Sequence, residues 1–368
     1  MCSTNPEESV PKRWRVGIVG CGWAGKEHAR ALAKLKDRAD LCAIADSDPA
    51  VAQAQALAWH APRWTDDYHQ LLHDSERLDA VSLCLPHSLH APAAIAAARA
   101  GLHVLVEKPL ATTLEEADEM IAAAHAAGVH LLVAETARFN AAYLQAAELI
   151  HAGALGALFM VRISREHQMH AYLRQRPWFL ADPAGGITYS GGIHDFETLR
   201  MLAGEIDHVY ALPARKVLPE MAGDDSSVAL VGLEGGATAV IAESFSLRTP
   251  RPGVHVTAHG SQGSLWLYRE EIRLYTSAQD GQADQVRQWK VEAVDPFVAE
   301  VAHWLDCLDR GRVAPLVSPI RAEEQRKPLL AVLAAYASMQ RGERVYLAEF
   351  ERIRREPHPG GRGDGTQR

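Results

Sequence analysis

The stretch WRVGIVGCGWAGKEHARAL, residues 14–32, constrains the fold more than any other feature, because three glycines separate an apolar run from a helix-like pattern. Gly20, Gly22 and Gly25 have the spacing G-x-G-x-x-G that follows a strand and opens a helix in dinucleotide-binding proteins. The first glycine permits a tight turn, the second lets a pyrophosphate approach the backbone, and the third lets the helix pack on the strand. The N–H groups at the start of the helix then face the phosphates.

The sequence therefore predicts a dinucleotide site that includes Gly20, Gly22, Trp23, Ala24 and Gly25. The alternative is that the glycines merely end a strand, and a bare G-x-G-x-x-G is weak support by itself. The combination of a strand, a helix and a well-placed acid favours the dinucleotide site.

The acid is Asp46, which ends the second apolar run, LCAIAD, and lies 21 residues after Gly25. A carboxylate at this point accepts hydrogen bonds from the ribose hydroxyls of NAD and repels the 2′-phosphate of NADP. The alternative role for Asp46 is an N-cap of the next helix, but Asp48 or Ser47 can cap that helix equally well. Asp46 and the adjacent Ser47 are therefore predicted to bind NAD, with NADP disfavoured.

The first third of the chain alternates short apolar runs with Ala-rich helical stretches, which is typical of a doubly wound parallel sheet. The predicted strands are 15–20, 41–46, 79–86, 103–109 and 130–135. The predicted helices are 24–36, 49–59, 90–100 and 114–127. The fold class is thus α/β, with an N-terminal Rossmann domain.

The pattern changes near residue 137, where runs that alternate apolar and polar residues begin. Alternation of this kind predicts a largely antiparallel open sheet with helices on one side, hence a C-terminal α+β domain. We expect a Rossmann domain over 1–136, an α+β substrate and oligomerisation domain over 137–354, and a disordered tail over 355–368. Two helices, roughly 296–310 and 321–341, are expected to close the fold and can pack back on the first domain.

Composition limits the partners and the compartment. The 368 residues carry a formal net charge of −8, which gives no electrostatic reason to expect nucleic acid or an anionic membrane. Five widely spaced cysteines indicate a reducing compartment, and no apolar run approaches the length of a membrane span. The N-terminus lacks an apolar signal core, so the cytoplasm is the expected location. No metal site is predicted, because the paired histidines lack a carboxylate or thiol set.

Two further segments carry residues suited to chemistry. Glu107-Lys108-Pro109 ends the fifth strand, at the edge of a parallel sheet where ligands bind, so Lys108 is a candidate contact for a substrate hydroxyl or carbonyl. The alternative is a solvated surface lysine. His194 follows a glycine cluster near the start of a helix and is a candidate general base. The alternative is a structural histidine, one of 18 in the chain.

The segment HQMHAYLRQRPWFLADP, residues 167–183, precedes the glycine cluster and is rich in aromatic and basic side chains. It is a candidate lid in which Tyr172, Arg174, Arg176 and Trp178 face substrate hydroxyls or a phosphate. The alternative is a packed surface excursion or a contact between subunits.

Taken together, the glycine fingerprint and four further motifs resemble the Gfo/Idh/MocA oxidoreductases, a family that includes glucose–fructose oxidoreductase and inositol 2-dehydrogenase. The four motifs are CLPHSLH (84–90), EKP (107–109), ETARFN (135–140) and GGITYSGGIH (185–194). The resemblance covers roughly residues 14–345. It implies hydride transfer between NAD(P) and a ring carbon of a sugar, a sugar derivative or a cyclitol.

The resemblance also implies roles for individual residues. Lys108 would contact the reacting oxygen and His194 would act as acid or base, while Pro86, His90 and Glu107 would lie near the nicotinamide half of the cofactor. A cis Lys108–Pro109 peptide bond is expected, since only proline reaches that state at low cost.

One position departs from the family pattern. The family commonly has an aspartate four residues before the histidine, and this chain has Ser190 there. Asp195 or Glu197 would then replace the aspartate, Tyr189 would join the relay, or proton transfer would rest mainly on Lys108. An inactive site is the remaining possibility. Tyr189 and Ser190 are counted with the lid residues as candidate substrate contacts.

Two other functions remain open at this point. One is an NAD-dependent glycosidase or epimerase with transient oxidation, and the other is a non-catalytic, cofactor-binding regulator. The exposed face of a broad antiparallel sheet is a common pairing surface, so a homodimer or homotetramer is expected.

Overall fold

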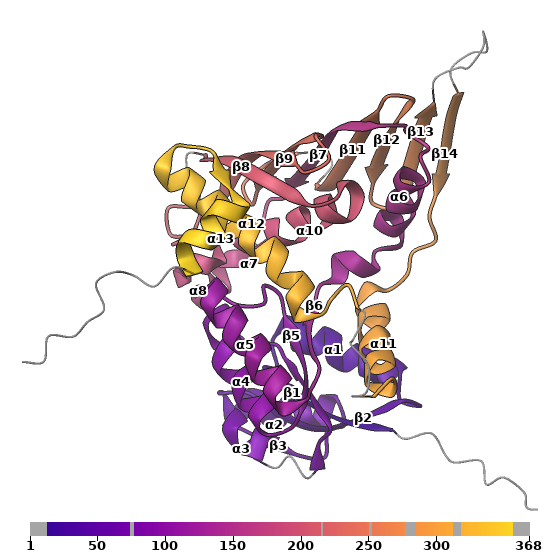
Figure 1. The fold of residues 1–368 in the computed structure, drawn as a ribbon. Coiled ribbons are helices and arrows are strands. Elements are labelled where there is room, and N and C mark those ends of the chain that lie inside the picture. The colour runs from indigo at the N-terminus through magenta and orange to yellow at the C-terminus, as the bar shows by residue number, and fades with distance from the viewer. Residues whose placement is uncertain are drawn as a thin grey trace, which may run out of the picture.

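The computed structural model describes residues 13–73, 77–214, 216–249, 252–276, 285–311 and 318–355 of the chain. Two β-sheets, one above the other in Figure 1, organise the molecule. The N-terminal sheet has six strands and the C-terminal sheet has nine.

The six-stranded sheet is parallel, with strand order β3-β2-β1-β4-β5-β6. Its strands are β1 (Trp14–Val19), β2 (Ala39–Ala45), β3 (Trp64–Thr65), β4 (Ala80–Leu83), β5 (His103–Glu107) and β6 (Leu131–Ala134). The strand order reverses at β1, which lies between β2 and β4, and ligands bind beyond the carboxyl ends of the strands at such a point. The predicted Rossmann sheet is confirmed. Only β3, two residues long, was not predicted.

Helices connect these strands, and polar caps fix where two of them begin. The helices are α1 (Trp23–Lys34), α2 (Pro49–Ala58), α3 (Tyr68–His73), α4 (His90–Arg99) and α5 (Leu114–Ala127), with the 3₁₀ turn η2 (His87–Leu89) before α4. Asp48 caps α2 by accepting hydrogen bonds from two backbone N–H groups, and Thr113 caps α5. Gly128 ends α5 in the left-handed conformation.

The nine-stranded sheet has the order β14-β13-β12-β11-β7-β10-β9-β8-β15 and is antiparallel except for the parallel pair β7 and β10. Its strands are β7 (Leu158–Glu166), β8 (Ile206–Pro213), β9 (Ser226–Leu233), β10 (Thr238–Ser244), β11 (Gly253–Gly260), β12 (Gly263–Tyr268), β13 (Glu271–Thr276), β14 (Gln285–Lys290) and β15 (Val345–Tyr346). The expected largely antiparallel sheet is confirmed, and β14 and β15 add two strands that were not predicted.

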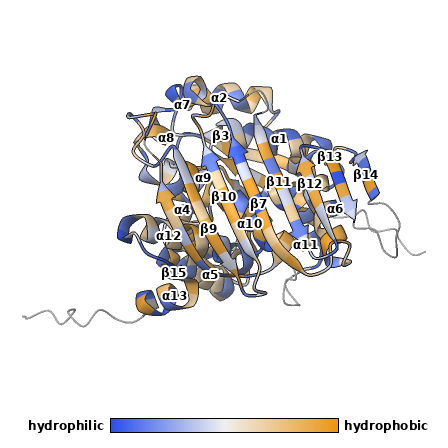
Figure 2. Ribbon diagram, turned by 90° about the horizontal axis from the view of Figure 1, so that it is seen from above, coloured by the Kyte–Doolittle hydropathy of each residue, from blue (hydrophilic) through white to orange (hydrophobic). Residues whose placement is uncertain are grey.

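Helices cover one face of this sheet. The helical elements between β6 and β8, together with the long helix α12, belong to this half of the molecule. They are η3 (Thr136–Phe139), α6 (Ala141–His151), α7 (His170–Arg174), α8 (Pro177–Ala181), η4 (Pro183–Gly185), α9 (Ile187–Ser190), α10 (Gly192–Ala203) and α12 (Ala322–Arg341). Figure 2 looks onto the opposite face, where the strands lie in front of α10 and α12. Val228 and Leu230 of β9 are exposed on that open face.

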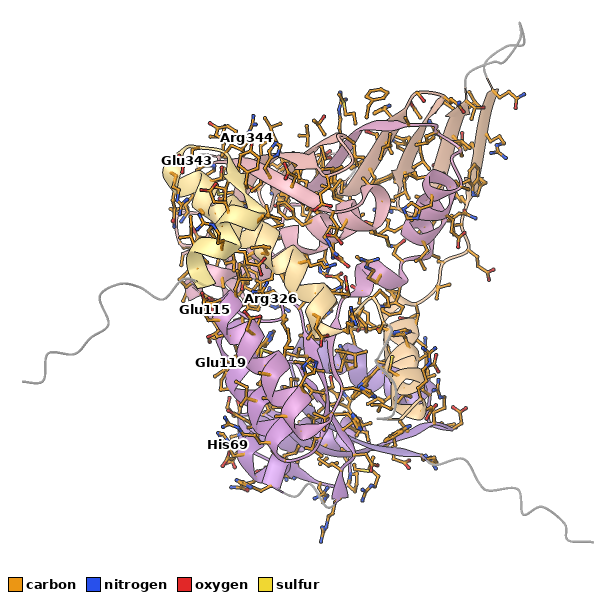
Figure 3. All side chains as sticks on the ribbon, viewed as in Figure 1. His69, Glu115, Glu119, Arg326, Glu343 and Arg344 are labelled. Carbon is orange, nitrogen blue, oxygen red and sulfur yellow. The ribbon has the colours of Figure 1, made fainter. Side chains whose placement is uncertain are left out.

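The C-terminal elements join the two sheets. Helix α11 (Pro296–Asp309) packs against α1, and its buried Trp304 belongs to the same apolar cluster as Ile18 of β1. Arg326 of α12, labelled in Figure 3, binds Asp118 of α5 and Glu351. Glu351 lies on α13 (Leu347–Arg355), a third closing helix that was not predicted. Apart from Arg355, the expected tail at 355–368 lies outside the described residues.

Candidate active site

The glycine turn after β1 is built as the fingerprint requires. Gly20 has a φ of +93°, and a β-carbon there would lie 2.1 Å from the carbonyl oxygen of Cys84. A β-carbon at Gly25 would lie 2.0 Å from the carbonyl oxygen of Gly20. Both positions therefore need glycine so that the turn can form and α1 can approach β1.

Gly22 differs from its two neighbours. A β-carbon built there meets no atom of the described residues within 4 Å, and its backbone φ of −71° suits any residue. Gly22 lies at the N-cap of α1 and lines a cavity. No contact within the described part of the chain requires glycine at this position, but a phosphate group beside the backbone N–H groups would. The turn thus fits the pyrophosphate of a dinucleotide.

Asp46 reaches from the end of β2 to the glycine turn. Its Oδ2 accepts a hydrogen bond from the Cys21 N–H at 2.8 Å, and its Oδ1 accepts one from the Asp48 N–H at 3.1 Å. Asp48 is the N-cap of α2, so Asp46 is not needed for that purpose. The Asp46 carboxylate is therefore held at the cavity where a ribose diol would donate to it.

The cavity has a volume of about 880 Å³ and brings most of the predicted residues together. The predicted cofactor residues that line it are Gly20, Gly22, Trp23, Ala24, Asp46, Ser47, Pro86, Glu107 and Lys108. Tyr172, Arg176 and Trp178 of the expected lid line it as well. The predicted residues that do not line it are Gly25, His90, Arg174, Tyr189, Ser190 and His194.

Lys108 follows the last residue of β5, and its peptide bond to Pro109 is cis, as expected. The Lys108 Nζ donates to the carbonyl oxygen of Ser190 at 2.8 Å. Burial lowers the pKa of Lys108, although the carboxylates of Glu107 and Glu135 oppose this effect. A partly buried amine with a lowered pKa exchanges protons more readily near neutral pH than a solvated lysine does.

His194 is the third residue of α10, and its side chain is 18% exposed. Its Nδ1 lies 2.5 Å from Oε1 of Glu135, a residue just past the end of β6 with no exposed surface. Burial raises the pKa of Glu135, but the charge and hydrogen bond of His194 and the Ala137 N–H together lower it below its usual value. Glu135 is the functional candidate that sequence reasoning missed.

The carboxylates that were considered as replacements for the family aspartate bind elsewhere. Asp195 forms a two-pronged ion pair with Arg165, at 2.8 and 2.6 Å. Glu197 binds Arg138 and Arg200. The expectation that either of them partners His194 is therefore wrong, because both are committed to buried guanidinium groups.

The hydroxyl groups of Ser190 and Tyr189 are also bound to other groups, in both cases backbone carbonyl oxygens. The Ser190 hydroxyl donates to the carbonyl oxygen of Gly186 at 2.8 Å, within the same short helical segment. The Tyr189 hydroxyl donates to the carbonyl oxygen of Ala111. Burial raises the pKa of Tyr189 well above its usual range, so the phenol keeps its proton and does not serve a proton relay.

His90 and Gly25 support the site without lining it. The two ring nitrogens of the buried His90 bind the carbonyl oxygens of Pro109 and Leu85, at 2.8 and 2.9 Å. This histidine therefore ties together the chain segments that follow β4 and β5. Burial lowers the pKa of His90 to about 4, so the ring is neutral at physiological pH.

The expected lid segment contains the short helices α7 and α8, at the boundary between the two sheets in Figure 1. The ring of Trp178 packs edge-on against His87 of η2, and Asp182 lies 3.4 Å from the Nδ1 of the same histidine. Arg176 stacks on the Tyr172 ring with its guanidinium 3.5 Å from the ring centroid. Arg174 points to a different partner, Glu220.

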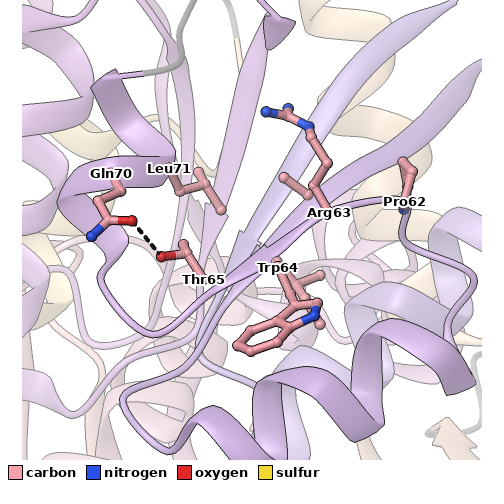
Figure 4. Close-up of a pocket in the computed structure, with 8 residues that line it drawn as sticks. Pro62, Arg63, Trp64, Thr65, Gln70 and Leu71 are labelled. Atoms are coloured by element: carbon pink, nitrogen blue, oxygen red, sulfur yellow. Dashed lines mark hydrogen bonds between the residues drawn. The ribbon is translucent and has the colours of Figure 1, made fainter.

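A second cavity, of about 530 Å³, lies at the β3 edge of the first sheet and is shown in Figure 4. It is lined by Pro62, Trp64 and Leu71 among others, and Thr65 donates to Gln70 at 3.1 Å within it. It shares no lining residue with the cavity of the glycine turn, so it is not part of the candidate active site.

Three other properties of the described residues bear on the class of protein. No helix in the part of the chain that the structure describes is long and apolar enough to span a bilayer. Within the same residues, no group of three or more His, Cys, Asp or Glu side chains is placed to hold a metal ion. The four described cysteines, Cys21, Cys42, Cys84 and Cys307, are free thiols.

A doubly wound sheet, a turn shaped for a pyrophosphate and a lysine amine in the same cavity are the features expected of a nicotinamide-dependent oxidoreductase. Two family models agree with this class. One, described as oxidoreductase family with an NAD-binding Rossmann fold, matches residues 14–135, and the GFO/IDH/MocA C-terminal domain matches residues 143–266.

Individual relatives support the same conclusion. The chain is 31% identical over 353 residues to a D-apiose dehydrogenase of Paraburkholderia graminis, which covers 92% of this chain and 91% of the relative. It is 28% identical to the myo-inositol 2-dehydrogenase of Thermotoga maritima, over 91% of this chain and 99% of the relative. The WlbA dehydrogenase of Bordetella pertussis, solved with NADH and UDP-GlcNAcA, superposes with a TM-score of 0.77 at 27% identity, over 91% and 99% of the two chains.

The chain belongs to the Gfo/Idh/MocA family of oxidoreductases. The predictions of an NAD-binding protein and of a dehydrogenase acting on CH–OH groups are thereby confirmed.

Proposed function

We propose that this chain transfers a hydride between NAD and a ring carbon of a sugar, a sugar derivative or a cyclitol, with Lys108 and His194 handling the hydroxyl proton. The observation that carries this proposal is the contact between the Lys108 amine, in the cavity of the glycine turn, and the Ser190 carbonyl, one helical turn before His194. Relatives named for apiose and myo-inositol support a polyhydroxylated substrate.

Each part of the site has a defined task in this proposal. The glycine turn and the N–H groups at the start of α1 hold the pyrophosphate, and the Asp46 carboxylate accepts hydrogen bonds from the ribose hydroxyls. NAD, when bound, supplies the hydride acceptor. Lys108 donates to the reacting oxygen and stabilises its developing negative charge, and His194 takes the hydroxyl proton. Pro86 and Glu107, which line the same cavity, would flank the nicotinamide half of the cofactor.

The proposal is tested by following NADH absorbance while the protein is mixed with pentoses, hexoses and inositols, with NAD or NADP as coenzyme. We expect net NADH formation with at least one free sugar or cyclitol, and faster turnover with NAD than with NADP because of Asp46. Substrate conversion without net formation of NADH would instead favour a glycosidase or epimerase with transient oxidation. NADH binding with no conversion of any compound would favour a regulator.

Residues 167–183 are proposed to form a lid over the reacting centre, because Tyr172, Arg176 and Trp178 line the cavity together with the glycine turn. Arg176→Gln is expected to raise the KM of the substrate or of NAD roughly tenfold or more, the effect of losing one charge-assisted hydrogen bond. Arg174→Gln is the matched control, because Arg174 lies on the same short segment but pairs with Glu220 away from the cavity. Steady-state kinetics that give equal KM values for both variants would contradict the lid.

A second copy of this chain is proposed to cover the open face of the nine-stranded sheet, giving a homodimer or homotetramer. The support is the uncovered apolar surface on β9, where Leu230 is 52% exposed. Light scattering is expected to give at least twice the 40.2 kDa mass of one chain. Leu230→Asp should shift this mass toward the single chain, and Leu57→Asp, at an 81% exposed position on α2, should not. A wild-type mass of one chain would refute the proposal.

The cytoplasm is the compartment we propose. The free thiols of the four described cysteines support a reducing environment.

A further inference from the structure

The proposed base of this site needs a negatively charged partner, and the usual position lacks one. An imidazole that takes a proton becomes a cation, which a neighbouring carboxylate stabilises and a serine hydroxyl does not. Ser190 stands four residues before His194, where the family resemblance implies an aspartate, and its hydroxyl already donates to the Gly186 carbonyl oxygen. Asp195 and Glu197 are bound to arginines.

Glu135 has the geometry to fill this role from another part of the chain. It lies just past β6 in the first sheet, whereas His194 belongs to α10 beneath the second sheet. Its Oε1 lies 2.5 Å from the Nδ1 of His194 and also accepts a hydrogen bond from the Ala137 N–H at 3.0 Å. The second contact fixes the carboxylate against its own backbone, so the imidazole meets a preorganised acceptor.

We propose that Glu135 is the positioning carboxylate of the His194 base, supplied by the dinucleotide-binding sheet in place of the aspartate that this chain lacks at Ser190. This inference depends on the proposed role of His194. It makes assembly of the base dependent on the contact between the two parts of the molecule, since neither part contains both groups.

The chemistry of the pair fixes which nitrogen is the base. An ionised carboxylate only accepts hydrogen bonds, so the His194 Nδ1 carries a proton and Nε2 has the free lone pair. During oxidation the substrate O–H bond would break and its proton would go to Nε2, while the C–H bond would break and its hydride would pass to NAD, which is the two-electron acceptor when bound. The resulting imidazolium stays paired with Glu135 and then releases its proton to solvent.

Charged groups from several elements face Glu135 and must be counted in any pH argument. Lys108, after β5, contributes a positive charge. The other three neighbours are two carboxyl groups and a phenol, namely Glu197 of α10, Glu300 of α11 and Tyr143 of α6. Glu135 Oε2 is buried and has no hydrogen-bond partner among the described residues. The carboxylate is therefore stabilised first by His194, then by the Ala137 N–H, and to a smaller extent by the charge of Lys108.

The experiment compares the pH dependence of kcat/KM in wild type, Glu135→Gln and Glu135→Asp, using a substrate found in the NADH assay. Glu135→Gln should lower kcat on the order of a hundredfold and move the acid limb of the profile about one unit to lower pH, because a neutral amide stabilises the imidazolium less. Glu135→Asp keeps the charge, so its acid limb should stay near that of wild type even where kcat falls. Ser190→Asp added to Glu135→Gln should recover at least about tenfold of the lost kcat.

Two controls separate this inference from a general loss of structure. Glu300→Gln changes another fully buried carboxyl close to Glu135 and should leave the acid limb unchanged, since no contact joins Glu300 to His194. The NADH dissociation constant, measured by fluorescence, should stay within about twofold of wild type in every variant. If Glu135→Gln fails to fold, the pH profile of Glu135→Asp tests the inference instead. A displacement of its acid limb by about one pH unit relative to wild type would overturn the inference.

The outcomes distinguish this inference from the proposed function. If Glu135→Gln keeps the kcat and the pH profile of wild type while His194→Ala loses turnover, the role of Glu135 is overturned. The proposed hydride transfer with His194 as base is then unaffected. Wild-type turnover in His194→Ala would instead remove the proposed base itself.

Discussion

Lys108→Met is expected to lower kcat by roughly 10²–10⁴-fold, the contribution of a positioned acid–base group. Methionine keeps the length and the apolar stem of lysine and removes only the amine. The amine lies in the cavity of the glycine turn, donates to the Ser190 carbonyl and has a pKa lowered by burial. Its loss removes the donor that stabilises negative charge on the reacting oxygen.

The measurement is kcat and KM by NADH absorbance, with NADH binding followed separately by fluorescence. Lys36→Met, at an exposed position after α1, is the matched control and should keep wild-type turnover. A Lys108→Met enzyme that turns over within about threefold of wild type would show that the amine is structural and does not stabilise charge on the reacting oxygen.

Gly22→Asp is expected to weaken NADH binding by roughly a hundredfold or more, about 3 kcal/mol, without destabilising the fold. A β-carbon at this position meets no described atom within 4 Å, and aspartate is a favoured N-cap residue at the start of a helix such as α1. The same carboxylate would occupy and repel the site of the pyrophosphate. The melting temperature without NADH should therefore stay the same or rise while the affinity collapses.

Gly20→Ala is the contrasting variant, because its β-carbon would lie 2.1 Å from a backbone oxygen at a φ of +93°. It should lower the melting temperature itself, since a strained residue of this kind costs about 1–3 kcal/mol before the clash is added. Equal NADH affinity in wild type and Gly22→Asp would mean that the dinucleotide does not lie on this turn.

The features that the sequence predicts well are those that depend on local pattern. Gly20 and Gly25 are required by contacts within one strand–turn–helix unit, and Asp46 ends the adjacent strand, so their spacing carries the information. The five longer strands of the first sheet are nearly continuous apolar runs, which the pattern identifies directly.

The features that the sequence does not predict depend on tertiary contact. Glu135 and His194 are separated by 59 positions along the chain, and their pairing follows only from how the two sheets are placed. The pattern also placed Asp195 and Glu197 closer to His194 in sequence, although their side chains turn toward arginines. The strand β3 has two residues, too few for a periodic signal.

The shortest helices and the exposed strand β14 are not predicted from the sequence for a similar reason. Helices α7 and α8 have five residues each, and an isolated helix of that length is not stable without its tertiary neighbours. Strand β14 is almost entirely exposed, so it lacks the buried alternation that marks a strand.

The crystal structure of this protein with NAD and a substrate from the NADH assay tests the central proposal most directly. We expect the pyrophosphate on the turn at Gly22, and the oxygen of the reacting carbon within about 3.5 Å of both the Lys108 Nζ and the His194 Nε2. A dinucleotide bound away from the glycine turn, or a substrate oxygen in contact with neither nitrogen, would contradict it.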